Sequence, residues 1–293
     1  MVKLKSVNTR TFELLKKHFW KMLGYVLLVS LISISINYIN AFVFESFAVS
    51  ILGYLIELYI STVMGIGLYK IMIKADDEED FGVNDLFSFV PRFKECLIAY
   101  GIQLMFAFFI TLLFSVFGAI LFMGDLGNLY GAYPFISNNF MASMILSLIP
   151  KLLFFIIFTM IITIICEIFP VMAMFLAAKE DKMFSKNLFT NTFSLGVKFI
   201  KPYLLLNLIY LGICILMIIP FFILLVIGIG AETLFGAFLT LFITVAFICA
   251  FIFLSVYFSL AIVVLLNKSL NIEIAKREEL FNARSSINND EIL

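Results

Sequence analysis

Histidine, clustered cysteine and charged side chains are scarce in this sequence of 293 residues. His18 is the only histidine, and the four cysteines stand far apart, in or beside apolar runs. A metal centre or a histidine-based catalytic site needs several such side chains together, so neither is expected. We expect no metal, no cofactor and no enzymatic activity, and we interpret the cysteines as small buried apolar residues.

Two further absences concern nucleotides and nucleic acids. The chain contains no G-x-x-x-x-G-K-[ST] sequence, the motif with which many nucleotide-hydrolysing proteins hold phosphate groups. It also contains no basic domain with interleaved aromatic residues outside its apolar runs, and its formal net charge is +0. The sequence therefore excludes nucleotide hydrolysis by that route, and nucleic acid is not an expected partner.

Apolar side chains are what the sequence has in abundance. Hydrophobic residues make up 63% of the chain and charged residues 14%, whereas about 25% of a soluble protein is charged. A helix of about 20 apolar residues crosses a bilayer core. We predict an all-α membrane protein, with a single membrane domain over 1–270 and a cytoplasmic tail over 271–293. Its six transmembrane helices are expected at about 22–44, 47–73, 96–123, 151–177, 203–228 and 234–266.

The basic residues lie almost entirely on one side of these predicted spans. Apart from Lys151, every Lys and Arg lies before the first span, in or beside the second and fourth connections, or after the last span. Cytoplasmic connections of membrane proteins carry such an excess of basic residues. We therefore predict that both termini are cytoplasmic.

Each odd-numbered span is preceded by a segment whose apolar and polar residues separate onto two faces of a helix. These segments cover 11–23, 84–97 and 187–201, and Pro91 is expected to divide the second into two short pieces. The pattern predicts a threefold repeat of a cytoplasmic amphipathic helix followed by a transmembrane hairpin. The segments either anchor the chain at the membrane surface, or dock a partner or gate a substrate. The partner-docking candidates are Phe87, Phe93, Phe193, Lys198, Phe199 and Lys201.

The third of these segments carries a family resemblance. The run from Glu180 through KNLFTNTFSLGVKF carries it: Ser194 and Leu195 match the family motif, Gly196 stands at its Lys-Gly position, and Phe199 supplies an aromatic residue. With the span that follows, this run resembles a bacterial six-helix membrane family that includes the membrane domain of some glycerophosphodiester phosphodiesterases. The resemblance implies a module of the bacterial cytoplasmic membrane. The phosphodiesterase activity is not expected, because no soluble stretch of this sequence is long enough for the catalytic domain.

Glu57, Glu167 and Lys151 are ionisable residues within the predicted spans, where a charge costs about 2.5–3.5 kcal/mol. Glu57 lies near the middle of the second span, Glu167 lies in the cytoplasmic half of the fourth, and Lys151 lies at the outer end of the fourth. Each is a candidate for substrate or proton binding. The alternative is a structural role: a hydrogen bond to a neighbouring helix for each acid, and extension to the outer headgroups for Lys151.

An acidic run, ADDEED at 75–80, follows the second predicted span. It lacks the alternating ligand spacing and the central glycine of a calcium-binding loop, so no calcium site is expected. We interpret the run as a solvated linker, with docking of a basic partner as the alternative.

These observations leave three hypotheses for the function. The first is a transporter-like protein that handles a lipid, a peptide or another amphipathic molecule, which the intramembrane acids favour. The second is a permease subunit of an exporter driven by a separate ATPase. The third is a scaffold or immunity protein that binds a hydrophobic, membrane-active peptide. Membrane lipids are expected partners in all three.

Overall fold

The computed structural model describes residues 3–43, 47–132, 138–179, 187–230 and 234–290. Within these ranges the chain is almost entirely helical and has no strand. Six helices are long and apolar enough to cross a membrane, which confirms an all-α, multi-pass membrane protein. The elements are α1 (Leu4–Val43), α2 (Phe47–Asp76), α3 (Val83–Phe87), α4 (Phe93–Ala132), α5 (Asn138–Lys179), α7 (Leu188–Gly230) and α8 (Leu234–Asp290).

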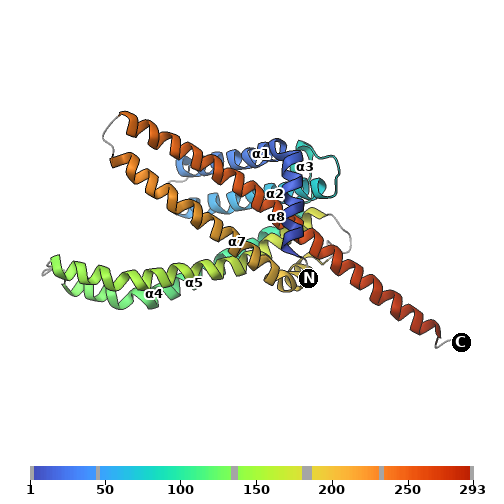
Figure 1. The fold of residues 1–293 in the computed structure, drawn as a ribbon. Helices are drawn as coiled ribbons and strands as arrows, with labels where there is room; N and C mark the ends of the chain where they lie inside the picture. Colours follow the sequence, from blue (N-terminus) through green and yellow to red (C-terminus); the bar gives the residue numbers. More distant parts are fainter. Residues whose placement is uncertain (1–2, 44–46, 133–137, 180–186, 231–233, 291–293) are drawn as a thin grey trace.

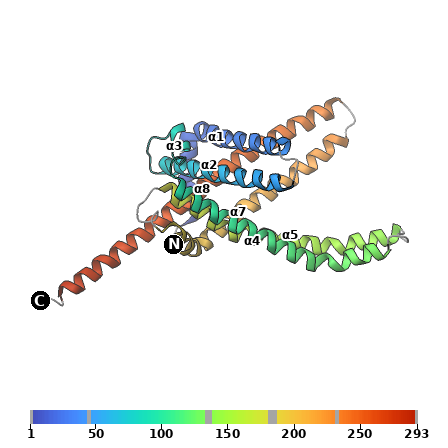
Figure 2. The same ribbon diagram turned by 180° about the vertical axis from the view of Figure 1, so that it is seen from behind.

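The long helices form three hairpins that spread from a common base: α1–α2, α4–α5 and α7–α8 (Figures 1 and 2). The α4–α5 hairpin diverges from the other two. α8 continues past the base and projects from its opposite side (Figure 1). Most of the predicted tail over 271–293 is therefore a continuation of α8, which ends at Asp290.

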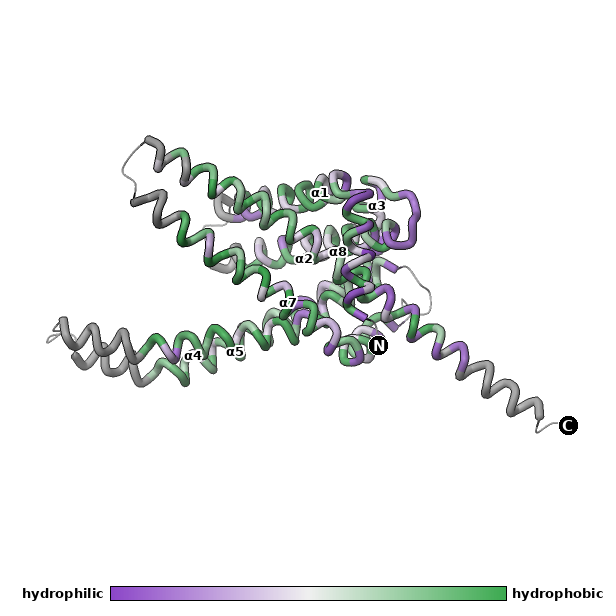
Figure 3. Tube along the Cα trace, viewed as in Figure 1, coloured by the Kyte–Doolittle hydropathy of each residue, from purple (hydrophilic) through white to green (hydrophobic). Residues whose placement is uncertain are grey.

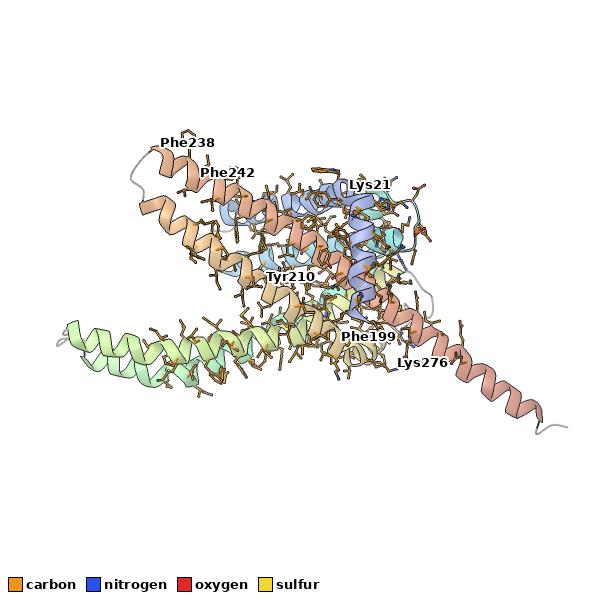
Figure 4. All side chains as sticks on the ribbon, viewed as in Figure 1. Lys21, Phe199, Tyr210, Phe238, Phe242 and Lys276 are labelled. Atoms are coloured by element: carbon orange, nitrogen blue, oxygen red, sulfur yellow. The ribbon has the colours of Figure 1, made fainter. Side chains whose placement is uncertain are left out.

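Local chemistry accounts for where the helices run and break. Hydrocarbon offers the backbone no hydrogen-bond partners, so the apolar runs form helices whose backbone groups bond internally. Pro91 separates α3 from α4, as predicted, because α3 ends at Phe87 and α4 begins at Phe93. The predicted amphipathic segment over 11–23 is part of α1. The helix bends near Lys21, so this segment runs across the direction of the rest of α1 (Figure 4).

The buried apolar core lies at the base of the hairpins. It is formed by the last turns of α2 and α5, the middle of α8, and the first parts of α1, α4 and α7. Its largest fully buried side chains include Ile66, Phe89, Met172, Phe175 and Tyr203. Along the arms many apolar side chains are exposed, as expected of surfaces that face lipid (Figure 3).

The hairpins meet in a regular order around this base. α4 packs against α2, α7 packs against α5, and α1 packs against α8. In each case the first helix of one hairpin meets the second helix of another. α2 also contacts α5 and α8, so the end of α2 lies among all three hairpins.

The short helix α3 lies directly on α2. A Cβ atom added at Gly67 would lie only 2.1 Å from the carbonyl oxygen of Leu86, so glycine is required for this approach. The Lys74 ammonium is 2.7 Å from a carboxylate oxygen of Asp85, and the Gly82 N–H donates to the other oxygen at 2.9 Å. Burial alone would raise the pKa of Asp85, but these two donors hold the pKa below its ordinary value.

A polar cluster joins four helices at the base. Asp76 of α2 is 7% exposed and accepts from Arg10 Nε of α1 at 3.1 Å and from Asn267 Nδ2 of α8 at 2.8 Å. The same Asn267 amide group donates to Asp77 at 3.0 Å, and Lys179 of α5 donates to the Asn267 amide oxygen. Asp76 and Asp77 therefore hold helices together, and the interpretation of the whole acidic run as a solvated linker is wrong at these two residues.

Candidate functional site

Glu57 is hydrogen-bonded within its own hairpin. Asn37 and Asn40 of α1 donate to the two oxygens of the Glu57 carboxylate, at 2.7 and 3.3 Å. The Asn40 amide group also donates to the Gly53 carbonyl oxygen at 3.1 Å. These contacts correspond to the structural alternative for Glu57, a hydrogen bond to a neighbouring helix, because its acceptor oxygens are occupied within the α1–α2 hairpin.

Glu167 has different surroundings. Its side chain is exposed and lines an open cavity of about 420 Å³ between α4, α5, α7 and α8. Within the described part of the chain, no hydrogen bond or ion pair reaches its carboxylate. The other residues that line the cavity are Phe114, Thr159, Met160, Thr163, Ile164, Asn207, Tyr210, Leu211 and Phe258.

Helical spacing places the polar side chains of α5 in a row. Thr159, Thr163 and Glu167 are four residues apart, so they share one face of α5. Across the cavity, the Asn207 amide group of α7 donates to the Tyr203 carbonyl oxygen at 3.0 Å, which fixes the orientation of the amide. The cavity thus combines one carboxylate with hydroxyl and amide groups in an otherwise apolar lining.

An aromatic pair forms one wall of the cavity. The rings of Tyr210 on α7 and Phe258 on α8 stack with centroids 4.0 Å apart and planes 19° apart. Such stacking holds both side chains in place in the lining of the cavity. A ligand suited to this lining carries an apolar body and a cationic or hydrogen-bond-donating group, because an unpaired carboxylate in a membrane favours such a partner.

Lys151 does not belong to this cavity. It lies on α5 sixteen residues before Glu167, about 24 Å along the helix, and is half-buried. The three ionisable candidates are therefore not brought together. Glu57 is held by α1, Glu167 faces the cavity, and Lys151 lies toward the tip of the α4–α5 hairpin.

The partner-docking candidates divide into outward and inward side chains. Phe87 and Phe93 are exposed, at 39% and 60%. Phe193 instead packs against the rings of Phe106 and Phe169, with centroids 6.0 and 5.2 Å away. Phe199 is buried as well. Lys198 and Lys201 are exposed and line a second cavity between α7 and α8.

Comparisons with protein-family models, with curated proteins and with solved structures found no match for this chain. The family resemblance of the segment after Glu180 therefore stays a prediction.

Several residues of the cavity were not among the sequence candidates. Asn207 interrupts the apolar run LLLNLIY, and a polar amide within a span is a signal of the same kind as Glu167. Thr159 and Thr163 could have been found from their four-residue spacing to Glu167. Nothing in the sequence pointed to Tyr210 or Phe258, because their role depends on the packing of α7 against α8.

Proposed function

We propose that this chain is a non-enzymatic, transporter-like membrane protein that binds an amphipathic molecule at the cavity beside Glu167. The observation that carries the proposal is an intramembrane carboxylate that lines a cavity and has no hydrogen bond or ion pair within the described residues. A lipid, peptide or other amphiphile with a cationic head would place its charge at Glu167 and its apolar body against the Tyr210–Phe258 wall.

The other two hypotheses receive less support. In both, surface side chains of the amphipathic segments recognise the partner. That partner is an ATPase in the permease hypothesis and a membrane-active peptide in the scaffold or immunity hypothesis. Phe193 and Phe199 are packed within the chain, so they offer little surface for such docking. The exposed Phe87 and Phe93 suit membrane anchoring, since α3 and the start of α4 lie at the polar base.

We also propose that the chain is built from a threefold repeat. Thr11 of α1 and Thr192 of α7 are both buried, and each hydroxyl donates to the carbonyl oxygen four residues earlier, at 2.9 and 2.7 Å. The residues four before and three after each threonine are buried too: Val7, Leu14, Leu188 and Leu195. The regular order in which each first helix meets a second helix of another hairpin supports the same repeat.

The proposed orientation puts the base and both termini in the cytoplasm, with the chain in a bacterial cytoplasmic membrane. Hydrophilic residues gather at the base, where Arg10, Lys74 and Lys179 take part in ion pairs (Figure 3). Basic residues of membrane proteins concentrate on the cytoplasmic side. In this orientation the cavity beside Glu167 lies in the cytoplasmic half of the membrane.

Glu167→Gln tests the proposed binding site. The probe is radiolabelled tetraphenylphosphonium, a cationic amphiphile, and the measurement is its saturable binding to the full chain in lipid nanodiscs. We expect at least a tenfold loss of affinity, which corresponds to about 1.4 kcal/mol, because glutamine has no charge to offer the cation.

Glu57→Gln is the matched control, since it removes the other intramembrane acid. We expect it to bind the probe as the wild type does, because Asn37 and Asn40 already occupy the Glu57 carboxylate. The proposal is wrong if wild-type protein binds no cation saturably, if Glu167→Gln binds like wild type, or if Glu57→Gln loses as much affinity.

A further inference from the structure

A second cavity lies at the base, between the beginning of α7 and the part of α8 that leaves the core. Its volume is about 300 Å³, at the small end of the range for small-molecule sites. Figure 4 shows Phe199 of α7 and Lys276 of α8 on the two helices that border it. The proposed cation-binding cavity beside Glu167 shares no lining residue with it.

Its lining carries an excess of positive charge. Lys198, Lys201 and Lys276 all face the cavity, and among the lining residues that the structure describes Glu273 is the one acidic residue. Lys198 Nζ lies 2.5 Å from the Glu273 carboxylate, so this pair is internally compensated. Lys201 and Lys276 are exposed, and within the described residues neither has a hydrogen bond or an ion pair. Two positive charges are therefore left to face a ligand.

The cavity lies where both of its helices change from apolar to charged sequence. In α7 the apolar run begins directly after Lys201 and Pro202, and in α8 it ends directly before Asn267 and Lys268. Such a boundary marks the headgroup level of a bilayer. Phe199, Pro202 and Ile272 give the same cavity an apolar wall.

We propose that this cavity binds the headgroup phosphate of an anionic phospholipid. Lys201 and Lys276 supply the two cations for the phosphate oxygens, and the Ser269 hydroxyl in the lining is a further donor. The apolar wall then contacts the glycerol and the first carbons of the acyl chains. Basic pockets between transmembrane helices at this level bind the headgroups of anionic lipids.

The site prefers an anionic lipid to a zwitterionic one for an electrostatic reason. A choline headgroup would bring its own cation beside Lys201 and Lys276, whereas a phosphatidylglycerol headgroup adds no positive charge. The cavity is large enough to hold a lipid headgroup, but it is too small to hold a segment of protein.

The test measures lipid binding to the full chain by native mass spectrometry from detergent, with phosphatidylglycerol and phosphatidylcholine of the same acyl chains. We expect phosphatidylglycerol to bind at least tenfold more tightly than phosphatidylcholine. The double substitution Lys201→Gln/Lys276→Gln should weaken phosphatidylglycerol binding about tenfold, because each lysine near a membrane surface contributes appreciably to anionic lipid binding. Lys201→Arg/Lys276→Arg should retain it.

Lys5→Gln/Lys94→Gln is the matched control, because it removes two exposed lysines that do not line the cavity. It should bind phosphatidylglycerol as the wild type does. The assignment is overturned by equal binding of the two lipids, by an unaffected Lys201→Gln/Lys276→Gln protein, or by an equal loss in the control. Full competition by millimolar inorganic phosphate would assign the cavity to a soluble phosphate compound instead.

Discussion

Gly67 shows how one residue fixes the position of a whole element. Its missing side chain lets the α3 backbone approach α2, where an added Cβ would meet the carbonyl oxygen, carbonyl carbon and Cα of Leu86 within 2.8 Å. Backbone atoms cannot rotate away as a flexible side chain does. Gly67→Ala should therefore displace α3 and lower the free energy of unfolding by about 1–3 kcal/mol, the usual cost of overpacking.

Thermal unfolding in mild detergent measures this change. The control is Gly101→Ala on α4, where an added Cβ has no atom within 4 Å, so its unfolding temperature should not fall. Equal unfolding temperatures for the two variants would mean that α3 does not pack against α2 in this way.

The residues of the candidate site divide into those that sequence could identify and those that it could not. Glu57 and Glu167 stand out because each interrupts an apolar run. Their different environments could not be read from the sequence. Asn37 and Asn40 reach Glu57 from the preceding helix, whereas the cavity beside Glu167 needs side chains from three other helices. Periodicity identifies neighbours on one helix, but not partners across helices.

At the scale of the element, the amphipathic segment over 11–23 contacts the rest of the protein on one face and is exposed on the other. The Lys21 ammonium donates to the Phe81 carbonyl oxygen at 2.7 Å and lies 4.3 Å from the centre of the Phe81 ring. Phe12 and Trp20 are 51% and 80% exposed. This combination suits a segment that lies along the membrane interface with its aromatic residues at the headgroup level.

Trp20 reports on this placement, because it is the only tryptophan in the sequence. In vesicles, we expect its fluorescence to be quenched more strongly by lipids brominated near the glycerol than by lipids brominated near the chain ends. The matched control, Trp20→Phe/Phe108→Trp, moves the tryptophan to a 69% exposed position near the middle of the predicted third span. Its quenching should follow the opposite order. Absence of lipid quenching at Trp20 would place the segment in water.

Element boundaries were harder to predict than element types. The six apolar runs predicted six membrane-spanning helices, because length and hydropathy alone decide that a segment is inserted as a helix. The amphipathic segments over 11–23 and 187–201 were predicted as separate surface helices. The structure instead includes them in α1 and α7, although α1 bends near Lys21 and Pro202, which has no backbone N–H, directly follows the second segment. Pro91 is the exception, and there α3 and α4 are separate.

At the scale of the whole molecule, the helices pack together at the base and separate into three hairpins away from it. The core and the polar cluster of Arg10, Asp76, Asp77, Lys179 and Asn267 lie at the same base. The cluster is coupled through Asn267, because removing this side chain would take a hydrogen-bond partner from Asp76, Asp77 and Lys179 at once. Its members come from four helices far apart in sequence, so no local pattern predicted it.

This concentration of charge at the base makes the orientation testable. If basic residues determine the topology, the base faces the cytoplasm and the connection after residue 130 lies outside. Alkaline phosphatase fused there should be active, whereas a green fluorescent protein at the C-terminus should be bright, because the first folds only outside the cytoplasm and the second only inside. Exchanging the two reporters is the control. The phosphatase should then be inactive and the green fluorescent protein should be dark. An active phosphatase at the C-terminus would reverse the orientation and move the Glu167 cavity to the outer half of the membrane.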